Sequence, residues 1–395
     1  MLSLSQRSEK VAPSSTLAIT AKINSMQAEG IDIVKFAAGE PDFDTPEHIK
    51  DAAIESLRNG FTKYTPVPGI TELREAIVEK FKTDNNLVFS PSQIIVSCGA
   101  KHAIYNILQA ICNPGDEVVF AAPYWVSYPE IVKLADATPV IVETTADENF
   151  CMKPEQIESV LSDRTKAVII SSPGNPTGTV YDAPTLAQIA ELALNRQFYV
   201  ISDEIYEALI YDNLKHQSIA SLNEAVQEIT FVVNGVSKAY SMTGWRIGYT
   251  AGPEKAIQAM SRIQSHSTSN PTSIAQIGAL TALAESQEAV EEMRQAFEER
   301  RNVICQRFDE IDGITYAKPQ GAFYIFPDVS AHYGRRIHGK TINGSLDMTA
   351  YLLDNARVGV IPGSASGADN HLRLSFATSL EEINSGLDRI KEALT

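Results

Sequence analysis

Cysteine is scarce in this chain, and its positions argue against two classes of protein. The 395 residues include only four cysteines, Cys98, Cys112, Cys151 and Cys305, and none of them forms a CxxC pair. Cysteines scattered in this way support neither a disulfide framework nor a zinc knuckle. We therefore expect small, buried, apolar side chains in a reducing compartment, and no metal site.

The chain also lacks long apolar runs, and it has fewer basic than acidic residues. No stretch approaches the ~18 apolar residues that a membrane helix needs, and residues 1–15 lack the apolar core of a signal peptide. The chain has 33 basic and 49 acidic residues, a net charge of −16, which disfavours nucleic acid and anionic membranes as partners. We expect a soluble, cytoplasmic protein, in which a few cations in a cleft could still attract an anionic substrate.

Short apolar runs alternate with helical patterns through the first two thirds of the chain. This alternation predicts an α/β fold in which helices cover a mostly parallel sheet. The apolar runs are residues 93–97, 117–122, 138–142, 166–171, 198–203 and 229–234, and the clearest helical patterns between them are residues 101–111 and 186–196.

The pattern changes after Pro271. One long helix is predicted as far as about Ile311, followed by a smaller α+β unit. A helix over residues 15–29, which begins behind Pro13 and Ser14, is expected to pack with that unit. We expect a large domain of residues 46–290 and a discontinuous small domain of residues 1–45 and 291–395. The strands predicted for the smaller unit are residues 321–327, 357–361 and 371–376, and its closing helix is predicted from Ser379 or Leu380 to Leu394.

The segment VSKAYSMTGWRIGY, residues 236–249, places one lysine in a short polar turn directly after an apolar strand. A lysine amine can form a Schiff base with a carbonyl group if its surroundings hold it still and keep it partly unprotonated. Ser237 and Arg246 add a hydroxyl group and a cation, which are suited to an anion such as a phosphate ester. We interpret Lys238 as a covalent catalyst.

Polar side chains follow two further predicted strands. Asn175 comes after residues 166–171, and Asp203 ends residues 198–203. Because ligands bind at the carboxyl ends of parallel strands, these side chains and Lys238 are expected to meet in one site. A carboxylate at that depth is costly unless it meets a cation, and Tyr206 lies on the same face if a helical turn begins at Asp203.

The segment SCGAKHA, residues 97–103, is a turn of small residues that opens a helix. The free amides of such a turn suit a phosphate group. Lys101 in the first turn opposes the helix dipole, and a bound anion would explain its position. Trp125 offers an indole that could either stack on a planar ring or pack in the core.

Residues 334–341, GRRIHGKT, fit the phosphate-loop pattern of nucleotide triphosphatases. Such a loop must follow a buried strand and open a helix at its lysine. The residues PDVSAHY precede this segment, and Asn343 and Gly344 would interrupt a helix that began at its lysine. We therefore predict a basic surface loop at this position.

Six motifs in order along the chain resemble the class I aminotransferases of the fold-type I pyridoxal phosphate (PLP) enzymes, most closely the subgroup of bacterial aspartate aminotransferases. The resemblance covers nearly the whole chain and implies a mostly parallel seven-stranded sheet with a smaller α+β domain. The motifs are AAGEPDFDTP (37–46), YTPVPGITELREAI (64–77), SSPGNPTG (171–178), SDEIY (202–206), VSKAYSMTGWRIGY (236–249) and HLRLSFA (371–377).

The resemblance also implies roles for individual residues. Lys238, Asp203 and Tyr206 would be catalytic: Lys238 would bind PLP covalently, Asp203 would pair with the pyridine nitrogen, and Tyr206 would bind the ring hydroxyl together with Asn175. Trp125 would stack on the ring. The remaining cofactor-binding residues would be Gly99, Ala100, Lys101, Ser237, Arg246 and, from a second subunit, Tyr64. A role for Tyr64 across subunits implies a homodimer with shared active sites.

For the substrate, the resemblance implies that Arg373 binds the α-carboxylate, with Gly39, Trp125 and Asn175 nearby. Lys101 would pair with a distal carboxylate. This favours ping-pong transfer between aspartate or glutamate and 2-oxoglutarate or oxaloacetate.

Three positions depart from the commoner family pattern, namely Cys98, Ser366 and Phe376. These departures leave open a pocket for aromatic or prephenate-like substrates. Diaminopimelate-type aminotransferases and PLP lyases share the cofactor residues and also stay open. A ligand-sensing regulator is disfavoured, because such proteins carry an added basic DNA-binding unit and this chain is acidic.

Overall fold

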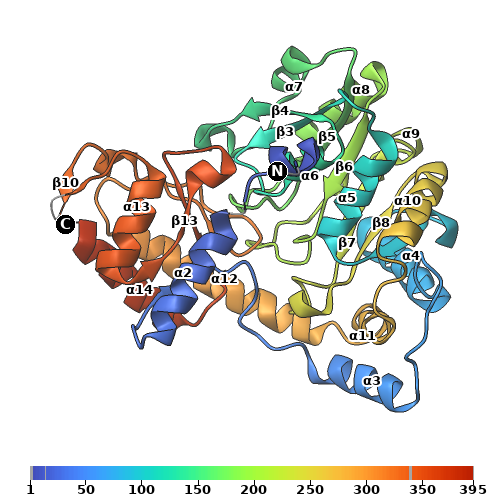
Figure 1. The fold of residues 1–395 in the computed structure, drawn as a ribbon, viewed down its shortest axis with the longest axis horizontal. Helices are drawn as coiled ribbons and strands as arrows, with labels where there is room; N and C mark the ends of the chain where they lie inside the picture. Colours follow the sequence, from blue (N-terminus) through green and yellow to red (C-terminus); the bar gives the residue numbers. More distant parts are fainter. Residues whose placement is uncertain (1–2, 14, 338–339, 395) are drawn as a thin grey trace.

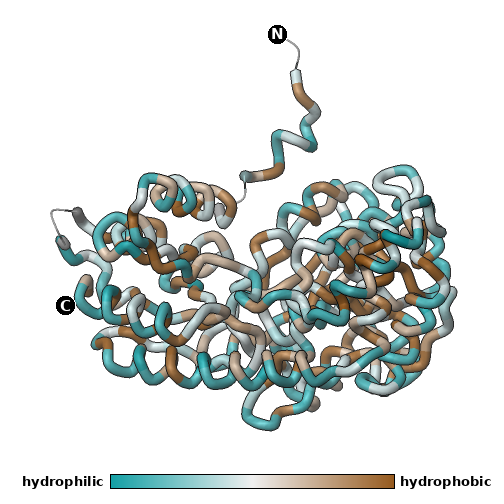
Figure 2. Tube along the Cα trace, turned by 90° about the horizontal axis from the view of Figure 1, so that it is seen from below, coloured by the Kyte–Doolittle hydropathy of each residue, from teal (hydrophilic) through white to brown (hydrophobic). Residues whose placement is uncertain are grey.

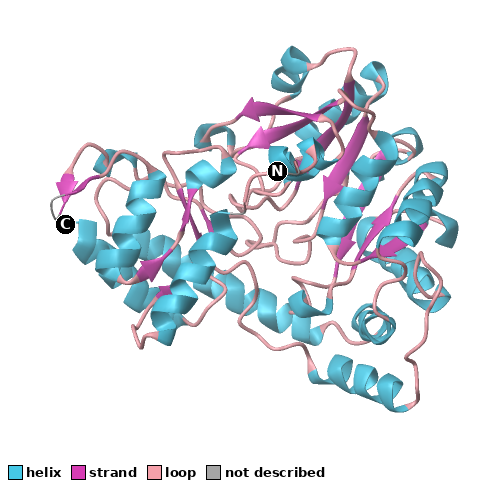
Figure 3. Cartoon of the chain, viewed as in Figure 1, coloured by secondary structure: helices cyan, strands magenta, loops and turns pink. Residues whose placement is uncertain are grey.

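The computed structural model describes residues 3–13, 15–337 and 340–394. A seven-stranded sheet with helices on both sides forms the larger part, on the right of Figure 1, and smaller sheets with the last helices form the part on the left. Figure 3 shows the strands of the large sheet side by side. Among the described residues, no helix combines the length and the apolar character that crossing a bilayer requires.

The large sheet has the strand order β2-β8-β7-β6-β5-β3-β4, and only β8 runs against its neighbours. Six of the strands match the apolar runs predicted from the sequence to within about a residue at either end. The prediction missed β8, which has four residues and begins with a glycine, and so carries little periodic signal. The strands are β2 (Ile94–Ser97), β3 (Glu117–Ala122), β4 (Thr138–Glu143), β5 (Thr165–Ser171), β6 (Tyr199–Asp203), β7 (Thr230–Gly235) and β8 (Gly248–Ala251).

The strands read as nearly continuous apolar runs because both faces of the sheet are covered. Along β3, Val118 and Phe120 pack in one cluster with α5, α6 and α10, while Val119 between them packs in another with α7 and α8. Hydrophobic segments, brown in Figure 2, gather toward the centre of this part. The helices of this part are α3 (Glu47–Arg58), α4 (Thr71–Asn85), α5 (Ala100–Ile111), α6 (Tyr128–Leu134), α7 (Pro154–Val160), α8 (Ala183–Arg196), α9 (Glu224–Gln227), α10 (Glu254–Ser267) and α11 (Ser273–Ala284), of which α3 packs on α11.

The prediction of a single long helix after Pro271 is wrong, because the structure has two helices there, α11 and α12 (Glu288–Phe308). Glu285 is extended, with φ −104° and ψ −162°. The side chain of Gln287 donates to the carbonyl oxygens of Ala282 and Glu285, each at 2.9 Å. These bonds satisfy carbonyls that the end of α11 leaves open, so the chain stops and restarts.

The smaller part packs around α12. Phe297 and Phe308 of α12 share a cluster with Tyr324, Leu374 and Leu387. Its predicted strands are present but shorter than expected. Its elements are α2 (Ser15–Ala28), β1 (Val34–Lys35), β9 (Tyr324–Ile325), β10 (Arg336–Ile337), β11 (Lys340–Thr341), α13 (Ser345–Tyr351), β12 (Val358–Gly359), β13 (Ile361–Pro362), β14 (Leu372–Ser375) and α14 (Leu380–Leu394).

The N-terminal segment joins both parts. Helix α1 (Gln6–Lys10) lies against α6, where Arg7 pairs with Asp136 at 2.5 Å, whereas α2 contacts β12 and β13. Figure 2 shows this segment reaching away from the body of the molecule toward the N-terminus. Ser14, which the sequence suggested as part of the cap of α2, lies outside the described residues, and the domain limits at residues 46 and 290 stay a prediction.

The GRRIHGKT segment does not have the context of a phosphate loop. Strands β10 and β11 within it pair antiparallel, and the next helix, α13, begins only at Ser345. Residues 338 and 339 lie outside the described residues. A hairpin followed by a delayed helix agrees with the predicted loop and not with a strand-loop-helix phosphate site.

Gly248, at the start of β8, packs closely against the backbone of the turn before α5. A substitution at this position tests how much that close packing contributes to stability. A Cβ atom on Gly248 would lie 2.2 Å from the amide nitrogen of Ala100 and 2.4 Å from the carbonyl carbon of Gly99. We predict that Gly248→Ala destabilises the protein by about 1–3 kcal/mol, as overpacking does, and lowers its melting temperature. Gly244→Ala is the matched control, because a Cβ atom there meets nothing within 4 Å. Equal melting temperatures for the two variants would contradict this packing.

Candidate active site

A cavity of about 570 Å³ opens at the carboxyl ends of β5, β6 and β7, where the sequence predicted a site. It brings together all but two of the predicted site residues. Those that line it are Gly39, Ala100, Lys101, Trp125, Asn175, Asp203, Tyr206, Ser237, Lys238, Arg246 and Arg373.

Lys238 lies in the turn after β7 and reaches into this cavity. Its Nζ donates a hydrogen bond to the carbonyl oxygen of Gly39 at 2.6 Å, and it lies 5.7 Å from the centre of the Tyr206 ring. Burial, and then the nearby Arg373, lower the pKa of Lys238 to about 8. A neutral amine is therefore available near neutral pH, as a nucleophile or a base requires.

Asp203 is the last residue of β6 and is 5% exposed. Its Oδ2 accepts a hydrogen bond from the hydroxyl group of Tyr128 at 2.6 Å, and its Oδ1 accepts one from the amide of Ile205 at 3.4 Å. Burial raises the pKa of Asp203 to about 6, against the effect of Tyr128. Near neutral pH the cavity thus contains a buried carboxylate, which favours a cationic or N–H partner.

Arg373 on β14 is a buried cation, 4% exposed, without an ion pair among the described residues. Its guanidinium donates to Asn175 Oδ1 at 3.3 Å and to the carbonyl oxygen of Ala37 at 3.0 Å, and it lies 4.7 Å from the centre of the Tyr324 ring. Its Nε is buried without a hydrogen-bond partner in the described part of the chain. Such a group is suited to a carboxylate that arrives from outside.

The turn before α5 lies on the other side of Lys238. Gly99 has φ +90°, and a Cβ atom on it would lie 2.4 Å from the guanidinium of Arg246. That guanidinium donates to the carbonyl oxygens of Thr243 at 2.8 Å and Cys98 at 3.2 Å. The first amides of α5 and the charge of Arg246 therefore meet at one place, which suits a phosphate.

Lys101 lies in the first turn of α5, with its Nζ 5.1 Å from the centre of the Trp125 ring. Burial, followed by Arg246, lowers the pKa of Lys101. The Trp125 indole is half-buried, and its edge meets Tyr128 with ring centres 5.4 Å apart. The indole faces the cavity, which agrees with a stacking position and not only with core packing.

The cavity has more positive than negative groups. Four cations line it, namely Lys101, Lys238, Arg246 and Arg373, against the two carboxylates Asp203 and Glu130. The carboxylate of Glu130 already accepts hydrogen bonds from Lys133 Nζ at 2.9 Å and from the amide of Ala12 at 2.8 Å. In a chain of net charge −16 this local excess favours a ligand with several anionic groups.

Sequence reasoning missed several residues of the cavity. Tyr128 lies one helical turn after Trp125, so that spacing could have indicated it. The hydroxyl groups of Tyr324 and Tyr206 are 2.9 Å apart, yet Tyr324 carries no local signal, because a distant strand delivers it. The same holds for the N-terminal segment, whose contribution to the lining is Ala12, Pro13, Thr16 and Leu17.

Two predicted cofactor-binding residues and one position named for the size of the pocket do not line the cavity. Tyr64 is 92% exposed and outside the cavity, and Gly99 borders the cavity without lining it. Tyr64 is expected to act from a second subunit, so its place outside this subunit's cavity does not contradict that prediction. Ser366, suggested as a cause of an enlarged pocket, is buried and binds the amide of Tyr124 through its carbonyl oxygen at 3.1 Å. Its neighbour Ala365 lines the cavity.

Comparison with known proteins agrees with this geometry. The sequence profile of the family "Aminotransferase class I and II" matches residues 31–390. An aspartate aminotransferase of Bacillus sp. (strain YM-2) is 50% identical over 98% of both chains. A probable aspartate/prephenate aminotransferase of Aquifex aeolicus (strain VF5) is 47% identical over 99% of this chain and 98% of that protein.

A solved structure of similar fold is the aspartate aminotransferase of Thermus thermophilus with maleate. It superimposes with a TM-score of 0.93 and 43% identity over the full length of both chains. The fold-type I α/β architecture predicted from the sequence is therefore confirmed. Together, the profile, the relatives and the fold establish that this chain belongs to the class I and II aminotransferase family.

Proposed function

We propose that this aminotransferase uses PLP to move an amino group between L-aspartate or L-glutamate and a 2-oxo acid. The observation that carries the proposal is a partly neutral lysine, Lys238, in a cavity that also holds three other cations and a buried carboxylate. The names of the relatives and the maleate complex of a similar protein support a dicarboxylic substrate.

The residues of the cavity fit PLP group by group. The turn at Gly99 and Ala100, with Ser237 and Arg246, offers amides, a hydroxyl group and a charge for the phosphate. Asp203 offers a carboxylate for a protonated ring nitrogen. Asn175 and Tyr206 would bind the ring hydroxyl, Trp125 would cover the ring, and Lys238 would bind the aldehyde.

When bound, PLP supplies an electron-poor ring that accepts the electron pair left after the substrate loses its α-proton. Asp203 would stabilise the positive charge on the ring nitrogen. The attraction between the carboxylate and that charge offsets the cost of burying the carboxylate. The Nζ of Lys238 would be freed when the substrate amine takes its place on PLP, and with its lowered pKa it would then move the proton between the α-carbon of the substrate and the cofactor. A second oxo acid then reverses the sequence, which gives ping-pong kinetics.

The substrate would lie between two cations. Arg373 would bind the α-carboxylate in a bidentate pair, since its guanidinium is buried without an ion pair in the described part of the chain. Gly39 and Asn175 lie beside it. Lys101 at the opposite wall would pair with the distal carboxylate of aspartate or glutamate.

A second candidate substrate is prephenate or another aromatic acid. The relative from Aquifex aeolicus, named a probable aspartate/prephenate aminotransferase, favours it. The apolar wall that Leu17 and Trp125 contribute to the cavity could receive a ring.

We also propose that the enzyme is a homodimer in which Tyr64 contributes to the phosphate site of the second subunit. Tyr64, Ile54 and Leu57 are 92%, 45% and 51% exposed. Ile54 and Leu57 lie one turn apart on α3, so they form a continuous apolar surface. Ile54 and Leu57 line a hollow together with Trp245 and Arg246, beside the phosphate region. A second copy placed there would cover this surface.

Lys238→Ala tests the proposed function. Without the amine, the purified protein should lose the borohydride-stable link to PLP, the visible absorbance of bound PLP and all turnover with aspartate and 2-oxoglutarate. Lys215→Ala, which removes an exposed lysine outside the cavity, is the control and should keep all three. A Lys238→Ala protein with full activity would refute the proposal.

Lys101→Ala tests the dicarboxylic preference. The KM for aspartate should rise roughly tenfold, because one charge-assisted hydrogen bond is worth ~1.5 kcal/mol or more. The KM for phenylalanine should change little, since phenylalanine has no distal carboxylate. The same loss for both substrates would count against a selective role.

Mixed dimers test the shared site. Tyr64→Ala alone should weaken PLP binding, and Lys238→Ala alone should abolish activity. A heterodimer of the two variants contains one site with both native residues, so it should regain about half of the wild-type activity per dimer. Failure of the mixture to regain any activity, with heterodimers present by mass, would exclude this arrangement.

A further inference from the structure

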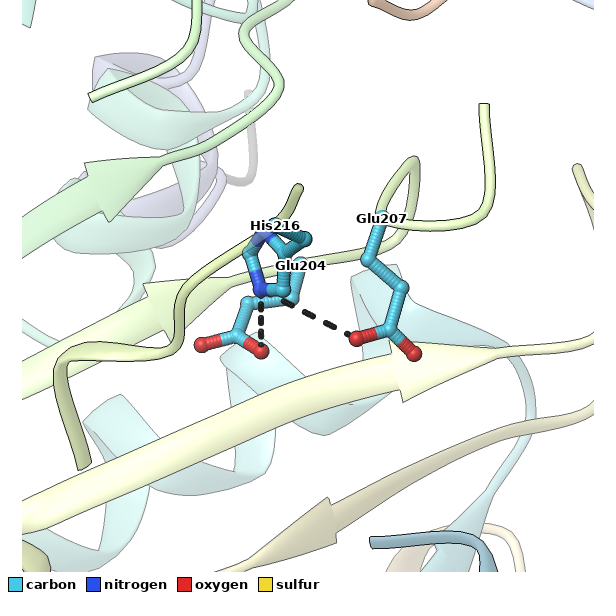
Figure 4. Close-up of side chains that lie close together, drawn as sticks. All are labelled: Glu204, Glu207 and His216. Atoms are coloured by element: carbon cyan, nitrogen blue, oxygen red, sulfur yellow. Dashed lines mark hydrogen bonds and ion pairs between the residues drawn. The ribbon is translucent and has the colours of Figure 1, made fainter. Parts of the chain in front are cut away.

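A network of buried charged side chains lies behind the cavity, on the far side of the residues that line it. Asp203 and Tyr206 line the cavity, whereas Glu204 and Glu207 do not. Figure 4 shows these two glutamates converging on the ring of His216. Within residues 203–207, at the end of β6, Asp203 and Tyr206 thus line the cavity, and Glu204 and Glu207 belong to this network.

Glu204 is fully buried and its carboxylate is saturated. Its Oε1 accepts hydrogen bonds from Ser202 at 2.7 Å and Ser218 at 2.6 Å, and its Oε2 lies 2.8 Å from His216 Nε2. Its amide donates to the carbonyl oxygen of Val233 on β7 at 2.9 Å. Glu204 therefore connects the end of β6 to β7 and to the loop that carries His216.

Glu207 is equally well bonded. Its carboxylate accepts hydrogen bonds from Lys80, from Asn85 at 2.5 Å and from Asn234 at 2.7 Å. It lies 3.8 Å from His216 Nε2. Lys80 and Asn85 belong to α4 and Asn234 to β7, so this carboxylate ties a covering helix to the strand that leads to Lys238.

The charges balance when His216 is protonated. Lys80 and a protonated His216 then face the two carboxylates, with Asp84 outside at 3.8 Å from Lys80. Burial acts to lower the pKa of His216, but Glu204 and then Glu207 outweigh it, so this pKa is raised. The titratable neighbours of Glu207 on the remaining side are Tyr240 and Tyr249, and burial keeps both hydroxyl groups neutral.

The same three residues could in principle ligate a metal ion, since their ligand atoms lie within 4.8 Å of one another. Lys80 opposes this, because its ammonium already neutralises Glu207. A protonated His216 donates its Nε2 hydrogen to Glu204 and has no lone pair at that nitrogen for a metal. An ion network explains the geometry without an added cation.

We propose that Glu204, Glu207 and His216 are positioning residues that hold Asp203 and Lys238 in register for the cofactor. The proposal rests on the PLP function proposed above. Asn234 completes the link, since its Oδ1 accepts the amide hydrogen of Gly235 at 2.7 Å, three residues before Lys238. One network thus fixes the segment after β6 and the segment after β7, from which the two central groups of the site project.

Glu204→Gln, His216→Gln and the double variant test this role in the PLP-loaded enzyme. Each single variant should raise the dissociation constant of PLP about tenfold, because each breaks a hydrogen bond to a buried charge. The kcat should fall about as much, while the KM for aspartate changes less than twofold, because Arg373 and Lys101 belong to other segments. The double variant should be no worse than either single variant, as expected for two partners in one contact.

Asp212→Asn is the control for a purely structural effect. It breaks the ion pair with Arg301, a fully buried arginine outside the network, and should lower the melting temperature while leaving the PLP dissociation constant unchanged. If Glu204→Gln does not fold, Ser218→Ala removes one hydrogen bond to Glu204 without a change of charge, and should weaken PLP binding by about two- to threefold. Folded variants that keep wild-type PLP affinity and kcat would overturn the proposal.

The pH dependence of stability adds a readout on the protein without PLP. A histidine whose pKa is raised in the folded state stabilises the fold below its ordinary pKa of 6.5 and loses this effect as the pH rises through the folded value. The gap in melting temperature between wild type and His216→Gln should therefore be wider at about pH 6 than at about pH 9. A gap that does not change with pH would overturn the charged network.

Two further outcomes separate the possible failures. Wild-type protein that gives no borohydride-stable link with PLP would refute the proposed function, whereas an intact link with unaffected network variants would refute only this inference. Equilibration with Zn²⁺ alone should leave no bound metal after dialysis. One Zn²⁺ per chain that disappears in His216→Gln would overturn the ion network in favour of a metal site.

Discussion

The site depends on the burial of two groups, one amine and one carboxylate, at the same edge of a parallel sheet. Burial moves the pKa of Lys238 down to about 8 and that of Asp203 up to about 6, so both values lie within reach of neutral pH. In water the same groups would be fixed in their charged forms near neutral pH. The strand ends provide this environment because helices cover both faces of the sheet and the cavity opens at its carboxyl edge.

The chain after β6 uses its two sides for different tasks. Asp203 and Tyr206 line the cavity, while Glu204 and Glu207 bond to groups on the opposite side. A few consecutive residues thus contribute to both the cavity and the network behind it. A buried carboxylate such as Asp203 is costly unless it is hydrogen-bonded, and Tyr128 and Ile205 supply two such bonds. In the proposed network, the bonds of Glu204 to Ser202 and Ser218 would fix the backbone on the other side of Asp203.

The sequence sufficed where the signal is local. The ends of β5, β6 and β7 were predicted because apolar runs followed by Asn175, Asp203 and Lys238 have a meaning in any parallel sheet. Strand β8 and Tyr324 were missed because tertiary pairing alone defines them, and the break between α11 and α12 depends on a side-chain cap that no periodicity indicates. The individual roles assigned to the predicted site residues stay predictions.

The two cations expected to bind substrate differ in what it costs to leave them unpaired. Arg373 is 4% exposed and its Nε has no hydrogen-bond partner in the described part of the chain. Without a bound carboxylate, its buried charge is therefore uncompensated. Lys101 is much more exposed than Arg373, although burial still lowers its pKa, and its ammonium lies over the Trp125 ring at 5.1 Å. Solvent and the indole face therefore satisfy part of its charge in the absence of a carboxylate. We therefore expect an α-carboxylate to be required for binding, and a distal carboxylate to add affinity without being required. Such an asymmetry would let one cavity accept aspartate and an aromatic acid in turn.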